Sequence, residues 1–170
     1  GYTTTSGVFI NEECLMQGDT TGPLSAGVVL KDKRVTLGVL ETARGGILRG
    51  GLGYDLADVA VITNISEDHL GQDGVKTLED LANIKSVVLE ALHQKGKAVL
   101  NADDPLVVAM GERARAEIIY FSRNPDNIVV RRHLGAGGKA IFIKGSNMVL
   151  AEGQRIVRLV NLKDIVLAKG

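Results

Sequence analysis

Apolar runs alternate with helix-periodic stretches along the first 122 residues of the chain. Two runs, Arg34–Leu40 and Asp58–Ile62, are nearly continuous in apolar residues rather than alternating with polar ones, which is typical of strands buried in a parallel sheet. Shorter apolar runs predict further strands at Val8–Ile10, Lys97–Leu100 and Glu117–Phe121.

The clearest helix is predicted to begin at Thr77, an N-cap residue followed by acidic side chains, and to end at Gly96. Its apolar stripe is formed by Leu78, Leu81, Ile84, Val88 and Leu92. Shorter helices are expected over Leu24–Leu30 and Asp104–Arg115, the second with Pro105 in the first turn, where proline is tolerated. This order of strands and helices indicates an α/β fold with a mostly parallel sheet.

The pattern changes after Ser122. The segments become short and partly alternating, and turns that contain glycine or asparagine separate them, which is typical of antiparallel hairpins. The expected strands are Asn127–Arg131, Lys139–Lys144, Asn147–Ala151 and Arg155–Val160. The sequence therefore predicts an α/β core over residues 1–122 and a small antiparallel β-appendage over residues 123–170.

Composition narrows the function classes. The chain has 170 residues, 45% hydrophobic and 24% charged, which fits one globular domain. Its 20 basic and 20 acidic residues balance, and it has three Tyr, three Phe and no Trp, so no nucleic-acid surface is indicated. No apolar run approaches the roughly 20 residues that cross a bilayer. The single Cys14 excludes an internal disulfide and fits a cytoplasmic setting.

The chain begins without an initiator Met and without a signal-like apolar core, so we interpret it as a piece of a longer protein. The phosphate-binding motif Gly-x-x-x-x-Gly-Lys-Ser/Thr does not occur in these 170 residues.

Polar residues follow both long apolar runs. Glu41 comes directly after the first run, and Asp68 and His69 follow the second. Taken singly, Glu41 is more often a solvent-facing carboxylate, and His69 a hydrogen-bonded structural histidine. If the strands are neighbours, however, both groups point into the crevice beyond the strand ends, where ligands bind in open α/β sheets. A carboxylate and an imidazole suit Mg²⁺ or Mn²⁺, and the hydroxyl of Thr21 could face the same metal or a phosphate.

Lys85 is out of place on its predicted helix. It lies four residues after Leu81 and three before Val88, so helical geometry puts it on the apolar stripe. The ordinary explanation is that the stem packs and the ammonium reaches water. The alternative is a lysine aimed at the active-site crevice, where a lowered pKa permits carbamylation of the amine.

Three further polar residues are candidates for ligand binding. Asn101 ends a predicted strand and could hydrogen-bond a base edge, whereas the following Asp103 and Asp104 are ordinary helix-capping residues. Arg44 and Arg49 flank glycines, and either could hold an anionic substrate.

Together these motifs resemble the central domain of the Mur ligase superfamily. The resemblance is carried by Glu41–Arg49, Thr63–Leu70 and Asn101–Asp104, with Asp19–Ala26 similar to one branch of that superfamily. It extends from residue 1 to about residue 104 and weakens through the C-terminal hairpins. It implies a P-loop-type α/β sheet, with the P-loop region upstream of this chain and the C-terminal ligase domain downstream.

The resemblance also implies an ATP-dependent amide ligase that phosphorylates a carboxylate and lets an amine attack the acyl phosphate. The family residues that match Glu41 and His69 hold magnesium, and a helical lysine such as Lys85 is often carbamylated. The asparagine that matches Asn101 contacts adenine. The branch with an Arg44 and Arg49 pattern joins arginine to the β-carboxylate of polymer-bound aspartate. The catalytic set implied for this chain is Glu41, His69 and Lys85.

Two other functions stay open. The chain could come from another Mur-type ligase that acts on folylpolyglutamate or a peptidoglycan precursor, or from a non-catalytic relative that only binds nucleotide. In every case we expect its partners to be other domains of the same polypeptide and a second copy in a homo-oligomer. We expect the isolated chain not to complete turnover.

Overall fold

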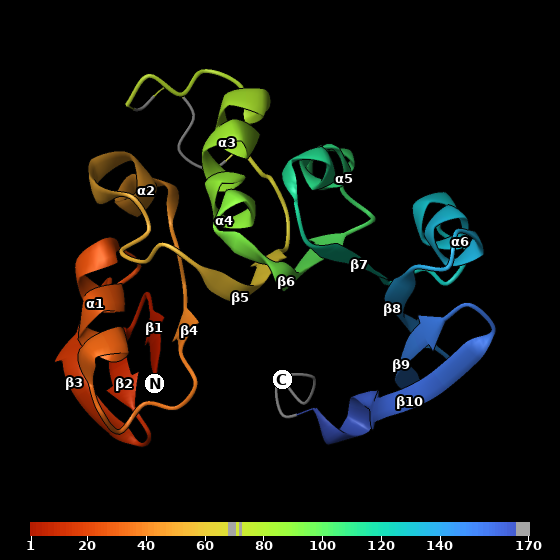
Figure 1. Ribbon diagram of the computed structural model, residues 1–170, viewed down its shortest axis with the longest axis horizontal. Coiled ribbons are helices and arrows are strands. Elements are labelled where there is room, and N and C mark those ends of the chain that lie inside the picture. Colours follow the sequence, from red (N-terminus) through yellow and green to blue (C-terminus); the bar gives the residue numbers. More distant parts are fainter. Residues whose placement is uncertain (68–70, 72, 166–170) are drawn as a thin grey trace.

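The computed structural model describes residues 1–67, 71 and 73–165, and its strands form two sheets (Figure 1). The larger sheet has the spatial order β10 (Arg155–Asn161), β9 (Asn147–Glu152), β8 (Lys139–Lys144), β7 (Glu117–Ser122), β6 (Leu92–Asn101) and β5 (Ala57–Ile62). The smaller sheet has the order β3 (Glu13–Gln17), β2 (Gly7–Ile10), β1 (Tyr2–Thr4) and β4 (Val39–Leu40).

The predicted fold class is confirmed. Strands β5, β6, β7 and β8 pair in parallel, and β8, β9 and β10 pair antiparallel at the C-terminal side. The helices between them are α1 (Pro23–Lys31), α2 (Arg44–Gly50), α3 (Leu78–Lys85), α4 (Val87–Glu90), α5 (Pro105–Met110) and α6 (Ile128–Gly135), with short 3-10 turns η1 (Gly111–Arg113) and η2 (Leu162–Asp164).

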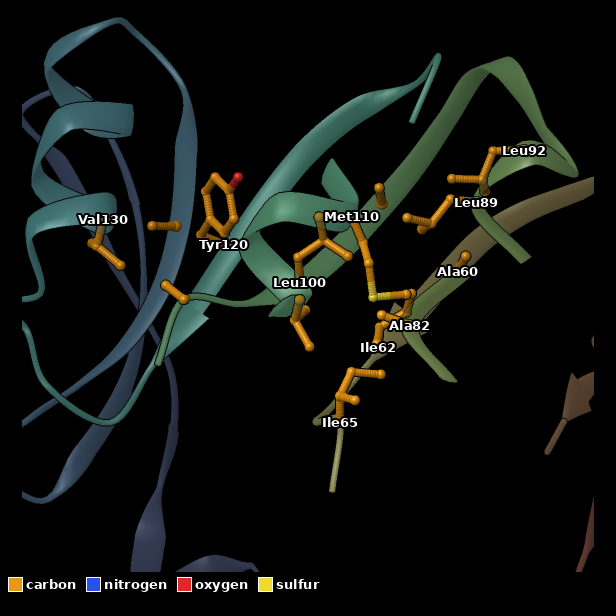
Figure 2. Close-up of a cluster of buried hydrophobic side chains, with 14 of the residues drawn as sticks. Ala60, Ile62, Ile65, Ala82, Leu89, Leu92, Leu100, Met110, Tyr120 and Val130 are labelled. Carbon is orange, nitrogen blue, oxygen red and sulfur yellow. The ribbon is translucent and has the colours of Figure 1, made fainter. Parts of the chain in front are cut away.

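The main core lies between the larger sheet and the helices α3 to α6, which follow one face of the parallel strands (Figure 1). Figure 2 shows Ile62 of β5 and Met110 of α5 beside Ala82 of α3, with Leu100 of β6 in the same cluster. Leu100 is completely buried. Burial of these apolar side chains is the main term that stabilises this half of the fold. A separate small core, built from Val8, Ile10 and Val29, lies under the smaller sheet.

The other face of the parallel strands is less well covered than a buried parallel strand requires. Val59 and Val61 of β5 are 54% and 57% exposed, although the sequence predicts both to be buried. The reason is that β5 is an edge strand and that α3 and α4 cover only the face carrying Ala60 and Ile62. Parallel sheets usually have both faces covered, so Val59 and Val61 form an exposed apolar surface on the edge strand β5.

We expect this exposed apolar surface to make the isolated chain self-associate. Replacing both Val59 and Val61 by Lys places charges on this face of the edge strand, which opposes its burial against a second copy. Sedimentation velocity should show larger species for the wild type and mainly monomer for the double variant. The matched control is Ile128→Lys on α6, whose side chain is 59% exposed but lies elsewhere. A wild type that stays monomeric would contradict the expectation.

The strand predicted at Arg34–Leu40 is wrong over most of its length. Only Val39–Leu40 forms a strand, β4, and Leu37 is 73% exposed. β4 pairs with β1 alone, and it is an edge of the smaller sheet, so little of the segment has a partner strand. The sequence predicts one continuous sheet, whereas β4 and β5 belong to different sheets and are not paired with each other.

The long helix predicted from Thr77 to Gly96 is interrupted. Its start is confirmed, because the Thr77 hydroxyl accepts a hydrogen bond from the Asp80 amide and the Asp80 carboxylate accepts one from the Thr77 amide. The helix breaks at Ser86, however, and α4 ends at Glu90, after which β6 begins at Leu92.

The strand predicted at Asn127–Arg131 is also wrong, because this segment lies at the start of helix α6. The Asn127 side chain accepts hydrogen bonds from the amides of Val129 and Val130 and so caps the helix. This helix links β7 to β8, and the antiparallel part of the sheet begins only with β9. Among the described residues, no helix is long and apolar enough to span a membrane.

Candidate active site

Three chain segments meet at the end of β1 and β4, and Glu41 lies at their junction. The Glu41 amide donates to the carbonyl of Thr3 at 3.3 Å, and the Glu41 Oε2 accepts from the Thr5 amide at 3.2 Å. The second segment is held by the Thr20 amide and hydroxyl, both of which donate to the Thr4 carbonyl, at 3.1 and 2.7 Å. Glu41 is exposed, and its second carboxylate oxygen has no hydrogen bond within the described part of the chain.

Thr21 is buried beside this junction. Its carbonyl accepts from the amide of Ala43 at 3.1 Å, and its hydroxyl and amide both donate to Asp19 Oδ1, at 2.7 and 3.2 Å. These two hydrogen bonds, together with the charge of Arg49, hold the pKa of Asp19 below its ordinary value. The Thr21 hydroxyl oxygen therefore has its proton turned to Asp19, and its lone pairs are left for another ligand.

A cavity of about 650 Å³ opens next to Thr21, between the start of α1 and the helix α2. It is lined by Asp19, Thr21, Gly22, Pro23, Leu24, Ser25, Gly46, Arg49 and Gly50. The close approach of α2 depends on Gly46, because a Cβ atom there would lie 2.8 Å from the Thr21 carbonyl oxygen. Arg49 is exposed and has no hydrogen bond or ion pair to any described residue, so its guanidinium is available to an anion in the cavity.

Arg44 is placed differently from Arg49. Its side chain is only 9% exposed, and its Nη2 lies 3.2 Å from Oδ2 of Asp73. This ion pair joins the first residue of α2 to the segment that precedes α3. Both arginines are expected from the sequence to bind substrate, but only Arg49 lines the cavity.

Asn101 ends β6 and bridges to β5. Its Nδ2 donates to the Thr63 carbonyl at 2.7 Å, and its Oδ1 accepts from the Asp103 amide at 2.9 Å. One amide hydrogen and one lone pair of the side chain stay unused, which is enough for one edge of a base. Asp104 caps α5 as predicted and also accepts from the Ile65 amide at 2.8 Å, which ties the segment after β5 to α5.

Asp103 is more than the helix-entry residue that the sequence predicts. Its carboxylate accepts hydrogen bonds from the Ser122 hydroxyl at 2.6 Å, the Arg123 amide at 2.9 Å and the Asn127 side chain at 2.9 Å. Partial burial raises the pKa of Asp103, but these three hydrogen bonds outweigh burial and bring the pKa below its ordinary value. Asp103 thus joins the ends of β6 and β7 to the start of α6.

This network predicts a pH dependence of stability. A carboxyl with a lowered pKa in the folded state stabilises the fold above the unfolded pKa, and the contribution is lost as the pH falls below 3.8 toward the folded pKa. We expect Asp103→Asn to be less stable near neutral pH and to lose less stability on acidification than the wild type does. Urea unfolding at a series of pH values measures this. The control is Asp55→Asn, at an exposed carboxylate without a hydrogen bond to any described residue. It should lose as much free energy of unfolding on acidification as the wild type does. The prediction would be contradicted if Asp103→Asn also lost as much as the wild type.

Lys85 is the last residue of α3 and is half-buried. It makes no hydrogen bond or ion pair with any described residue. The helix interruption that follows it at Ser86 was not predicted, and neither was the contact of Ser86 with Arg113, at 2.7 Å. The sequence signal for the interruption is weak, because serine is common in helices and its partner is distant along the chain.

His69 and Asp68 lie outside the described residues, so their predicted approach to Glu41 stays a prediction. Within residues 1–67, 71 and 73–165, no three His, Cys, Asp or Glu side chains are grouped closely enough to hold a metal ion. The donors that are described nevertheless suit Mg²⁺ by type, because a carboxylate oxygen of Glu41 and the hydroxyl oxygen of Thr21 are hard ligands.

The chain is similar in sequence to several known proteins. The family model described as "Mur ligase middle domain" matches residues 1–151. A cyanophycin synthetase from Synechocystis is 46% identical over 170 residues, and one from Crocosphaera subtropica is 45% identical over 170 residues. Both alignments cover 100% of this chain and 20% of the relative, so the chain spans about one fifth of their length.

A more distant relative and a solved structure are similar over part of the chain. A UDP-N-acetylmuramoylalanine–D-glutamate ligase from Symbiobacterium thermophilum is 31% identical over 64% of this chain and 22% of its own length. The crystal structure of MurF from Acinetobacter baumannii aligns with a TM-score of 0.48 and 24% identity, over 75% of this chain and 27% of that one. On the match over residues 1–151, this chain belongs to the Mur ligase middle domain family.

Proposed function

We propose that these 170 residues act as the central domain of an ATP-dependent amide ligase, and that the ligase adds arginine to the β-carboxylate of polymer-bound aspartate. The observation that supports this most is the 45–46% identity over the whole chain to cyanophycin synthetases. Mur ligases in general use ATP and Mg²⁺. The cavity lined by Thr21 and Arg49 supports the assignment, because it offers a hydroxyl oxygen for a metal and a cation for the substrate.

In this proposal Glu41, Thr21 and His69 hold Mg²⁺. The metal, when bound, neutralises the negative charge of the phosphate that is transferred. Glu41 is kept in place by the Thr5 amide, and Thr21 by Asp19. Lys85 is carbamylated and supplies an additional carboxylate, formed when its neutral amine nitrogen bonds to the carbon of CO₂ and releases one proton.

The remaining side chains bind and orient the reactants. Asn101 contacts the adenine edge with its unused amide hydrogen and lone pair, while its other bonds to Thr63 and Asp103 keep the side chain still. Arg49 holds a substrate carboxylate in the cavity. Arg44, which the sequence also indicates for substrate binding, acts through the loop that its Asp73 partner anchors.

The reaction needs two steps. A carboxylate oxygen of the substrate attacks the γ-phosphorus of ATP, and ADP leaves, which gives an acyl phosphate. The amine nitrogen of arginine then attacks the acyl carbon, the carbon–oxygen bond breaks, and phosphate leaves with one oxygen of the original carboxylate. We propose that the isolated chain does not complete these steps, because no phosphate-binding loop occurs within it, and that it works with other domains of the same polypeptide and as a homo-oligomer.

Phosphate release tests the proposal. The full-length ligase is incubated with ATP, Mg²⁺ and an aspartate-bearing primer, with and without arginine. Release that depends on arginine supports the proposal. Release that is indifferent to arginine would instead favour another Mur-type ligase, such as a folylpolyglutamate or peptidoglycan-precursor ligase, and other amines would then be screened. No release from a folded protein would favour a non-catalytic nucleotide-binding relative.

A further inference from the structure

One arginine far from the cavity joins the two helices on either side of the interruption at Ser86. Arg113 lies in η1, directly after α5. Its Nη1 donates to the Ser86 hydroxyl at 2.7 Å, and its Nη2 donates to Asn83 Oδ1 at 3.0 Å. Nη1 also lies 3.4 Å from Oε1 of Glu90. Because Asn83 belongs to α3 and Glu90 to α4, a single guanidinium contacts both helices.

These contacts explain why the helix breaks at this position. The Ser86 hydroxyl donates to the carbonyl of Asn83 at 2.7 Å, a back-bond of the kind that bends helices. Ser86 is completely buried, so its oxygen must find its hydrogen-bond donor inside the protein, and Arg113 is that donor. The positive guanidinium at the C-terminal end of α3 is also favourable for the helix dipole.

The interruption determines how the last turn of α3 is oriented, and Lys85 is the last residue of that turn. Ser86 follows Lys85 directly, and consecutive helical residues point about 100° apart. Arg113 can therefore hydrogen-bond Ser86 and hold the turn without blocking the lysine. Lys85 is half-buried and has no hydrogen bond or ion pair with a described residue. Its direction therefore depends on the backbone that Arg113 and Ser86 hold.

We propose that Arg113 is a positioning residue for Lys85: its fork between Ser86 and Asn83 fixes the α3–α4 junction and so places the Lys85 amine where its carbamate can support the metal site. This inference rests on the proposed function of Lys85. It assigns a role to Arg113, which lies in η1, whereas no residue placed in the site lies in that turn. In this inference Arg113 does not touch substrate, nucleotide or metal itself.

The test compares the full-length wild-type ligase with the variants Arg113→Met, Arg113→Lys and Ser86→Ala. The carbamylated fraction of Lys85 is measured by incubation with ¹³C-bicarbonate, trapping of the carbamate as an ethyl ester and peptide mass spectrometry. The apparent dissociation constants for Mg²⁺ and for ATP are measured on the same samples. In Arg113→Met the carbamylated fraction should fall by about 10-fold, and the apparent dissociation constant for Mg²⁺ should rise by about 10-fold. Effects of this size are usual when a group that orients a metal ligand is removed.

The ATP constant should stay within about two-fold in Arg113→Met, because Asn101 and its partners are untouched; a merely structural defect would move both constants together. Arg113→Lys should recover part of the effect, since one ammonium can donate to Ser86 or Asn83 but cannot span both. Ser86→Ala removes one oxygen atom and leaves no large cavity. It should also lower the carbamylated fraction of Lys85, which keeps the test valid if Arg113→Met folds poorly. Arg115→Met is the matched control, because Arg115 is exposed and has no partner among the described residues.

Wild-type values in Arg113→Met and Ser86→Ala would overturn the inference. Absence of the carbamate from the wild type would overturn it as well. Arginine-dependent phosphate release on that same wild-type sample separates such a result from a failure of the ligase assignment.

Discussion

Replacing Glu41 by Ala in the full-length ligase should lower arginine-dependent phosphate release by about 100-fold or more. A ligand to a metal that neutralises transferred phosphate contributes several kcal/mol to the transition state, and each factor of ten corresponds to about 1.4 kcal/mol. Glu41 is exposed, and the Thr5 amide is the one partner of its carboxylate in the described part of the chain. Its removal should therefore cost activity far more than stability.

Two measurements separate the metal role from a folding defect. Thermal unfolding of Glu41→Ala should differ little from that of the wild type. Glu12→Ala, at an exposed carboxylate in the turn before β3 with no partner among the described residues, should keep wild-type phosphate release. Near-normal release from a folded Glu41→Ala would remove Glu41 from the proposed metal site.

The largest loss of stability is expected from Leu100→Ala, at about 3 kcal/mol in the free energy of unfolding. Leu100 is completely buried in β6, opposite Ile62 of β5 and Tyr120 of β7. Its side chain lies close enough to Gly111 that an added Cβ there would be 3.3 Å from Leu100 Cδ1. Figure 2 shows Leu100 in the middle of the labelled core residues, so the cavity left by truncation has neighbours on both sides.

Urea unfolding measures this change, and Leu37→Ala provides the matched control. The same atoms are removed there from a side chain that is 73% exposed, so the free energy of unfolding should change by less than about 0.5 kcal/mol. A loss below about 1 kcal/mol for Leu100→Ala would mean that the two neighbouring strands and η1 close the cavity.

Features set by neighbouring residues could be predicted from the sequence. The Thr77 cap and the Asp104 cap depend on amides within three residues, and both were predicted where they occur. Helix α6 could have been found in the same way, because Asn127 precedes it and basic residues follow in its last turn. The β-branched residues Ile128, Val129 and Val130 favoured a strand instead, and the cap outweighs that preference.

Features that depend on distant contacts could not be predicted. The break at Ser86 requires Arg113, 27 residues further along the chain. Arg44 forms its ion pair with Asp73, 29 residues away. The positions of Glu41 after β4 and of Asn101 at the end of β6 follow from the apolar runs before them. Which of two similar arginines faces the cavity follows instead from how α2 packs against the loop before α1.

Isotope transfer tests the ligase assignment most directly. The aspartate-bearing primer is prepared with ¹⁸O in its β-carboxylates and incubated with the full-length ligase, ATP, Mg²⁺ and arginine. If the carboxylate is phosphorylated and then attacked by the amine, each released phosphate contains one ¹⁸O atom from the primer, and mass spectrometry of the phosphate detects it. Phosphate that is released without ¹⁸O, while arginine is still consumed, would contradict the acyl-phosphate mechanism on which the proposed function is built.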